Sequence, residues 1–223
     1  MKRKLASILL FVLILASHSM YAFDVEAVKI EITEQLAKDL KGHSSKNPVL
    51  LLIGGYPGAG KTTLITALAR KHDLSVISWN AIRQALLDRR LKGSPHDWEI
   101  IEAVNRNLLR MCVQRNATMI IDANAYANNI KLFERLLLEE GGENYQIVKI
   151  CLNPPSEVLL NRVRMRIPQE GVHQGTEKDL LADLNAEHKK INLNDYCLII
   201  NNANISFDYE LDIINSFLKL HFD

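Results

Sequence analysis

The chain has 223 residues, of which 48% are hydrophobic and 24% are charged, and its formal net charge is +1 at pH 7. This length and composition suit one globular domain with a real core. The near-zero charge gives no electrostatic case for binding an anionic membrane, and it weakly disfavours long nucleic acid as a partner. No internal repeat or low-complexity run interrupts the chain.

Residues 1–22 have the layout of a secretory signal peptide. Lys2, Arg3 and Lys4 form a basic start, residues 5–16 are nearly all apolar, and a cleavage site fits after Ala22. The apolar stretch is too short for a comfortable membrane span. We predict a signal peptide, or a membrane anchor if it is not cleaved, and hence a protein that is exported to the periplasm or beyond, or held at the membrane.

Residues 23–48 are predicted to form an N-terminal helix and a linker. Apolar residues recur at helical spacing over 24–41, and residues 42–48 then read as a loop. The remaining residues, 49–223, are predicted to form the main domain.

Residues 49–53 are five apolar residues, a pattern typical of a strand buried on both faces. They lead into Gly55-Tyr56-Pro57-Gly58-Ala59-Gly60-Lys61-Thr62, which is the P-loop signature, and an amphipathic helix follows to about Lys71. Glycines let such a loop turn its amides towards phosphate oxygens, and the helix adds the positive end of its dipole. We therefore expect Mg²⁺ and ATP or GTP as cofactors. The predicted nucleotide-binding residues are Gly55, Tyr56, Pro57, Gly58, Ala59, Gly60, Lys61, Thr62 and Thr63.

Four further strands are predicted to alternate with helices. The strands cover 74–78, 118–122, 146–152 and 196–200, and the helices cover 79–91, 94–115, 128–141, 153–166, 176–191 and 209–222. Ser94 is expected to cap the second of these helices, and Asn128 or Asn129 the third. This alternation predicts an α/β three-layer sandwich with a mainly parallel five-stranded sheet, the P-loop NTPase fold.

Polar residues follow three of the predicted strands, where ligands bind in parallel sheets. Lys61 would contact the β- and γ-phosphates, and the Thr62 hydroxyl would bind Mg²⁺. Asp122 ends its strand as a Walker-B acid does and is the second predicted metal ligand. Asn124 could orient substrate, or it could simply form a turn. Asn80 lies after the second strand, and it should reach the same crevice.

The sequence resembles the small P-loop kinases of the polynucleotide-kinase and zeta-toxin type. The similarity covers residues 49–200 and rests on the P-loop with its Pro-Gly pair, on Ser78-Trp79-Asn80-Ala81-Ile82-Arg83, and on residues 120–124 and 153–162. In those families an aspartate after the second strand is the general base, and an arginine three residues later binds substrate or the transferred phosphate. Asn80 and Arg83 occupy those positions here.

The substitution at Asn80 matters because an amide cannot accept the proton of a substrate hydroxyl as a carboxylate does. Asp122 or Asp97 could supply the base instead. Alternatively, transfer could proceed without a base, because the transition state is loose. A third alternative is a protein that binds nucleotide without transferring phosphate.

Arg162 and Arg166 are four residues apart and are expected on one face of a helix. The resemblance implies that they are lid arginines that neutralise charge on the γ-phosphate. With Lys61, Arg83 and Asn80, they complete the predicted catalytic set.

We expect an ATP-dependent phosphotransferase that passes the γ-phosphate to a hydroxyl acceptor. The acceptor would be a nucleotide sugar, a nucleic-acid end or another small metabolite. The alternatives are a nucleotide-binding module, an NTP hydrolase that regulates a partner, and a toxin-like effector.

Two features favour a cytoplasmic location instead of export. Cys112, Cys151 and Cys197 are odd in number and lie in apolar segments, so we predict buried free thiols, which hint at a reducing compartment. A P-loop enzyme also needs a nucleoside triphosphate, which is generally scarce outside the cytoplasm.

Overall fold

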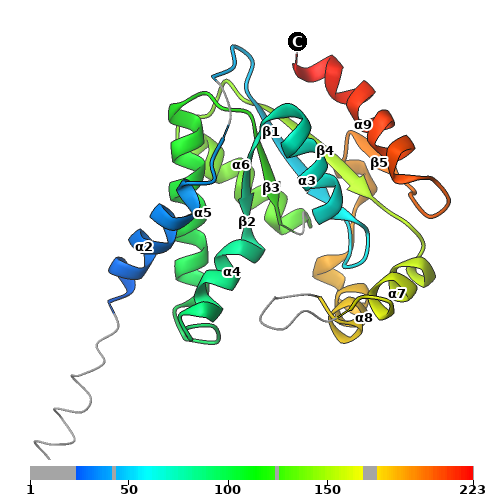
Figure 1. Ribbon diagram of the computed structural model, residues 1–223, viewed down its shortest axis with the longest axis horizontal. Helices are drawn as coiled ribbons and strands as arrows, with labels where there is room; N and C mark the ends of the chain where they lie inside the picture. Colours follow the sequence, from blue (N-terminus) through cyan, green and yellow to red (C-terminus); the bar gives the residue numbers. More distant parts are fainter. Residues whose placement is uncertain (1–23, 42–43, 124–125, 168–174, 223) are drawn as a thin grey trace, which may run out of the picture.

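The computed structural model of the protein describes residues 24–41, 44–123, 126–167 and 175–222 (Figure 1). The signal peptide or anchor predicted over 1–22 lies outside these ranges, as does Asn124. Within the described ranges, no helix combines the length and the apolar character needed to cross a membrane.

Five parallel strands form one sheet. They are β1 (Val49–Gly54), β2 (Ser75–Ser78), β3 (Met119–Asp122), β4 (Gln146–Leu152) and β5 (Leu198–Ile200), in the order β2-β3-β1-β4-β5. Every neighbouring pair is parallel, which confirms the predicted α/β fold. The P-loop strand β1 is therefore central, and the carboxyl ends of all five strands lie along the same edge.

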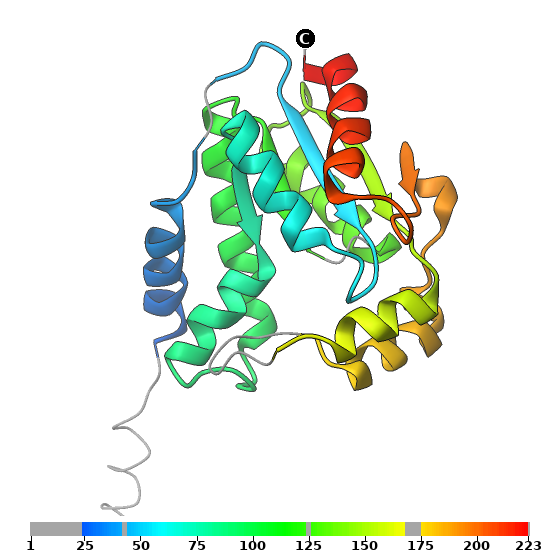
Figure 2. The same ribbon diagram turned by 45° about the vertical axis from the view of Figure 1, so that its right-hand side comes forward.

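Helices cover both faces of the sheet (Figures 1 and 2). Leu50 and Leu52 of β1 face a core shared with one group of helices, while Leu51 and Ile53 face the other core. This alternation follows from the two-residue period of a strand. The first group comprises α2 (Val25–Ala37), α4 (Trp79–Asp88), α5 (Asp97–Gln114) and α6 (Ala127–Glu139), and the second comprises α3 (Lys61–His72), α7 (Ser156–Arg164), α8 (Glu177–Asn185) and α9 (Phe207–Phe222).

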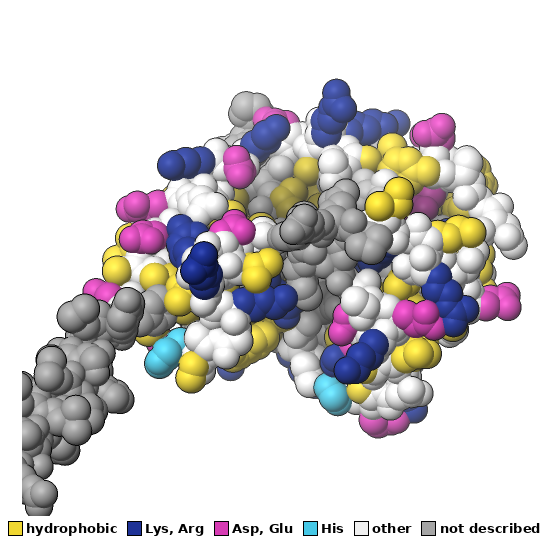
Figure 3. All heavy atoms as spheres, turned by 60° about the horizontal axis from the view of Figure 1, so that its bottom comes forward, with side chains coloured by type: hydrophobic (Ala, Val, Ile, Leu, Met, Phe, Trp, Pro, Cys, Tyr) yellow, Lys and Arg dark blue, Asp and Glu magenta, His cyan; other side chains and the backbone are white. Residues whose placement is uncertain are grey.

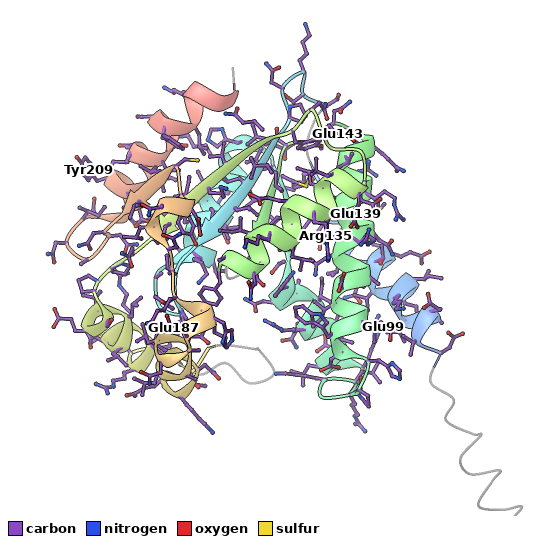
Figure 4. All side chains as sticks on the ribbon, turned by 180° about the vertical axis from the view of Figure 1, so that it is seen from behind. Glu99, Arg135, Glu139, Glu143, Glu187 and Tyr209 are labelled. Carbon is purple, nitrogen blue, oxygen red and sulfur yellow. The ribbon has the colours of Figure 1, made fainter. Side chains whose placement is uncertain are left out.

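The N-terminal helix α2 is attached to α5 rather than to the sheet. The Lys29 ammonium, which is largely buried, lies 2.6 Å from a carboxylate oxygen of Glu26 and 2.6 Å from one of Glu99. Figure 4 shows Glu99 on α5, beside α2. These contacts orient α2 on the side of the molecule away from α9.

Several helix boundaries differ from the predictions by a few residues, among them those of α5, α6 and α8. Helix α5 begins at Asp97 instead of at Ser94, because Asp97 accepts hydrogen bonds from the Gly93 amide and the Ser94 hydroxyl and so closes a turn there. Tyr126, not Asn128 or Asn129, precedes the first residue of α6.

Helix α8 ends at Asn185, whereas the prediction ran to residue 191. Ala186 is extended, with φ −82° and ψ 116°, and two short 3₁₀ turns follow, η1 (Glu187–Lys189) and η2 (Leu193–Asp195). The break lets Lys189 turn back towards α8.

The prediction of buried cysteines is confirmed for Cys112 and Cys151 and is wrong for Cys197, which is exposed. Cys197 precedes β5, which is an edge strand with a partner on one side only.

Candidate active site

The loop between β1 and α3 approaches the neighbouring backbone closely, which accounts for two of its glycines. Gly55 has φ +139°, and a Cβ there would lie 2.7 Å from the carbonyl oxygen of Leu152. Gly58 has φ +92°, and its Cβ would lie 2.9 Å from the carbonyl oxygen of Leu159 on α7. Any side chain at either residue would displace the loop from β4 or α7.

Gly60 is the N-cap of α3, and it has no side chain that could occupy the first amides of this helix. Lys61, the first residue of α3, turns back over the loop and donates to the carbonyl oxygens of Gly55 and Tyr56 at 2.7 and 3.2 Å. Desolvation lowers the pKa of Lys61 to about 8, although the charge of Asp122 opposes that shift. The loop therefore presents amides and one ammonium, as phosphate binding requires.

Asp122 lies at the end of β3 and is 7% exposed. Its Oδ2 accepts a hydrogen bond of 2.9 Å from the hydroxyl of Ser78, which is paired with it across β2 and β3. Burial raises the pKa of Asp122, whereas Ser78 and Lys61 lower it.

The residues present fit a magnesium ion that is held mainly by phosphate and water. Thr62 and Asp122 line the same cavity and supply hard oxygen atoms. Among the described residues no group of three or more His, Cys, Asp or Glu side chains forms a metal cage. Two protein oxygens are what a phosphate-bound Mg²⁺ site typically offers.

A cavity of about 570 Å³ opens at the carboxyl ends of the strands. Six of the predicted nucleotide-binding residues line it: Pro57, Gly58, Gly60, Lys61, Thr62 and Thr63. Gly55, Tyr56 and Ala59 are not in the lining, and the Tyr56 hydroxyl instead accepts a hydrogen bond from the Ile191 amide. Figure 3 views the molecule from this edge, where Lys and Arg side chains lie on both halves of the face.

Asn80 and Arg83, both on α4, line the cavity together with Trp79. The Arg83 guanidinium lies 5.5 Å from the centroid of the Trp79 ring. Trp79 is itself packed edge-on against Trp98, with the ring centroids 5.3 Å apart. Burial lowers the pKa of Arg83, whereas the charge of Asp97 raises it. The Arg83 guanidinium forms no hydrogen bond or ion pair with any described residue. Asp97 does not line the cavity.

The two predicted lid arginines do not share a helix face, because α7 ends at Arg164. In the sequence Pro168 follows closely, and helices usually end before the residue that precedes a proline. Arg166 is exposed and lines the cavity. Arg162 is not in the lining and instead donates to Asn202, to Oδ1 at 3.1 Å and to the carbonyl oxygen at 2.8 Å.

The sequence reasoning missed several cavity residues, among them Tyr126, Asp183 and Lys189. The Tyr126 hydroxyl donates to Oδ2 of Asp183 at 2.8 Å, and the Lys189 ammonium lies 2.5 Å from Oδ1. In the sequence, Asp183 is only an acidic residue between two apolar residues of a predicted helix. This pattern is too common to identify Asp183 as a site residue.

Comparison with known proteins supports the same assignment of fold. Residues 50–191 match the protein family described as an AAA domain (AAA_33). A search of the curated proteins finds no match.

Many solved structures resemble this chain, and two of them illustrate the likeness over most of its length. One is a protein from Chloroflexus aurantiacus J-10-fl that is provisionally described as a kinase, with 18% identity, a TM-score of 0.57, and coverage of 78% of this chain and 98% of that one. The other is a sugar kinase from Janibacter sp. HTCC2649, with 17% identity, a TM-score of 0.52, and coverage of 77% and 95%. At these identities the likeness shows the fold alone.

Proposed function

Because the chain belongs to the AAA_33 family of AAA domains and has a P-loop kinase-like fold, we propose that it is a phosphotransferase that uses magnesium and ATP, or GTP. It passes the γ-phosphate to a hydroxyl acceptor. Lys61 and the loop amides bind the triphosphate, and Thr62 and Asp122 hold the ion, which offsets negative charge on the phosphates.

One observation carries this proposal. A single cavity joins a phosphate-binding loop to an arginine that has no ion-pair partner among the described residues. Leaving a partly buried cation unpaired is costly, so Arg83 fits a site that an anionic ligand completes. A protein that only hydrolyses nucleotide has no need of this second site.

The acceptor is therefore a hydroxyl compound that carries a carboxylate or a phosphate. Arg83 binds that anion while Asn80 and the amides of Asn128 and Asn129, which also line the cavity, are placed for hydroxyl groups. A nucleotide, a nucleic-acid end and an acidic sugar all meet this description. The resemblance to polynucleotide kinases and zeta toxins favours the nucleotide compounds.

A panel of acceptors tests the proposal with ATP labelled at the γ-phosphate. We would compare a nucleoside 3′-phosphate, an oligonucleotide with a free 5′-hydroxyl, gluconate, and glucose as the neutral control. The proposal is supported if phosphate is transferred to an anionic compound and this transfer is lost in Lys61→Ala. In Arg83→Ala the KM for that acceptor should rise. Transfer to glucose alone would refute the role of Arg83.

Asn80 favours a second candidate, a nucleotide-binding module or NTP hydrolase. Its amide cannot take a proton from an acceptor. Tight MgATP binding without transfer to any acceptor, unchanged in Asn80→Asp, would establish this alternative. Phosphate release that rises when a partner protein is added would identify a regulated hydrolase. Growth arrest on expression that Lys61→Ala abolishes would instead identify a toxin-like effector.

For residues 1–22 we propose an export signal. The basic start and apolar stretch support it, while the buried thiols of Cys112 and Cys151 and the need for ATP argue for the cytoplasm. Mass spectrometry of the protein from its host decides between them. A mature protein that begins at Phe23 indicates export, and an intact Met1 in the cytosolic fraction excludes it.

A further inference from the structure

Three carboxylates line the cavity among the described residues: Asp122, Asp179 and Asp183. Two of them already have a role in the site or in the end of a helix. Asp122 contacts Ser78 beside the P-loop, on the side predicted to hold magnesium. Asp179 accepts hydrogen bonds from both the amide and the hydroxyl of Thr176, which form the capping box of α8.

Asp183 is the third carboxylate, and it lies one helical turn after Asp179 on α8. The residue is 6% exposed, although it lines a cavity that contains the phosphate-binding loop. Its charge acts on the Lys61 ammonium and opposes the lowering of the pKa of Lys61. Asp183 is thus distinguished by its place in the cavity, within electrostatic reach of the P-loop lysine, and not by burial alone.

Two contacts hold the Asp183 carboxylate in place. Tyr126 donates to Oδ2, and burial together with the charge of Asp183 raises the pKa of Tyr126, so that its hydroxyl stays protonated. Lys189, which reaches back from η1, contacts Oδ1. Each carboxylate oxygen has two lone pairs, so one remains on each oxygen for a hydroxyl donor.

We infer that Asp183 supplies the proton-accepting carboxylate that Asn80 cannot, an inference that rests on the proposed phosphotransferase activity. Asn80 and Arg83 lie on α4 and Asp183 lies on α8, and Figure 2 shows these two helices on opposite sides of the region below the sheet. An acceptor whose anion is bound by Arg83 can direct its hydroxyl towards α8.

The step balances as follows. The acceptor O–H gives its proton to Asp183 while its oxygen forms the new bond to the γ-phosphorus. The bond between that phosphorus and the oxygen bridging to the β-phosphate breaks, and its electron pair leaves with ADP. Asp183 then returns the proton to solvent.

The test compares the rates of Asp183→Asn and the wild type in two reactions, hydrolysis of MgATP by water and phosphate transfer to the best acceptor from the panel. We expect kcat to fall roughly 10²-fold with a much smaller change in the Kd for MgATP, since general-base catalysis contributes at least this much to the rate.

A rescue variant separates catalysis from structure. Asn80→Asp combined with Asp183→Asn should recover activity, because it places a carboxylate on the opposite wall of the cavity. A merely structural Asp183 would not be rescued in this way. Glu187→Gln is the matched control and should retain the wild-type rate. Glu187 lies on η1 beside Lys189 (Figure 4), but it does not line the cavity.

The possible outcomes are distinguishable. Full activity in Asp183→Asn overturns this inference alone, whereas a wild type that binds MgATP but transfers phosphate to neither water nor any acceptor overturns it together with the proposed function. If Asp183→Asn does not fold, Asp183→Glu, which displaces the carboxylate by one methylene, should lower kcat with a much smaller change in the Kd for MgATP. An unchanged kcat in this variant refutes the assignment.

Discussion

Arg162 binds Asn202 through two hydrogen bonds, from Nη1 to the side-chain oxygen at 3.1 Å and from Nη2 to the main-chain oxygen at 2.8 Å. The amide nitrogen of Asn202 in turn donates to the carbonyl oxygen of Ala59 and to Glu210, each at 2.9 Å. One buried asparagine thus connects α7, α9 and the phosphate-binding loop, which gives Arg162 a positioning role.

Asn202→Ala should lower the free energy of unfolding by about 2 kcal/mol, because it leaves buried polar groups without partners. It should also raise the KM for ATP, since the loop loses its link to α9. Urea unfolding and steady-state kinetics measure the two effects. Asn201→Ala, which alters the exposed neighbour, is the control and should change neither quantity. Equal effects of the two substitutions would contradict the connecting role of Asn202.

The affinity for MgATP should fall as the pH rises through about 8, where the desolvated Lys61 ammonium loses its proton. Below this pH the charged form of Lys61 binds the phosphates. At pH 9 only about a tenth of the free protein carries that charge, so the Kd for MgATP should be about tenfold higher than at pH 7. Calorimetry in buffers of different ionisation enthalpy should show proton uptake on binding at pH 9. Lys61→Met should bind weakly at both pH values, and a pH dependence that survives in it would exclude Lys61 as the cause.

Magnesium raises the affinity for ATP, and Asp122→Asn should reduce that gain by about tenfold or more. The variant loses a carboxylate that binds the ion directly or through water. Affinity for ATP measured in the presence of a chelator should change little. Titration calorimetry with and without Mg²⁺ provides the comparison. Asp88→Asn on the exposed side of α4 should respond to magnesium as the wild type does. An unchanged magnesium dependence in Asp122→Asn would place the metal elsewhere.

Gly58→Ala and Gly93→Ala form a matched pair, because both glycines have positive φ, +92° and +86°, but only Gly58 is close to neighbouring backbone. Gly93→Ala should cost about 1 kcal/mol of stability from backbone strain alone. Gly58→Ala should cost at least as much again, because its Cβ would meet the carbonyl oxygen of Leu159, and it should also weaken ATP binding. Thermal unfolding measures the stability losses, and calorimetry measures ATP binding. Equal stability losses in the two variants would mean that α7 moves away from the added methyl group at little energetic cost.

The residues that the sequence could locate are those whose signal is local. The P-loop from Gly55 to Thr62 contains its strand, turn and helix in one continuous stretch, and Asp122 ends an apolar strand, so both positions follow from short-range patterns. The parallel order of the sheet follows from the alternation of strands and helices.

The residues that the sequence could not locate depend on contacts across the fold. Asp183 becomes a cavity residue only because Tyr126, from a segment 57 positions away, meets it there. The position of Lys189 depends on the break at Ala186, where the predicted helix was expected to continue. Arg162 and Arg166 are separated by the end of α7, which helical spacing alone does not reveal.

The strand order has a consequence for local stability. The triphosphate loop follows β1, the central strand, which is protected on both sides by β3 and β4, whereas Asn80 and Arg83 follow β2 at the edge of the sheet. Edge elements open at lower free energy than central ones, so the β2–α4 amides should exchange hydrogen faster than those of β1. If α4 forms the acceptor wall, as the proposed function has it, substitutions there should change acceptor preference with little effect on nucleotide binding.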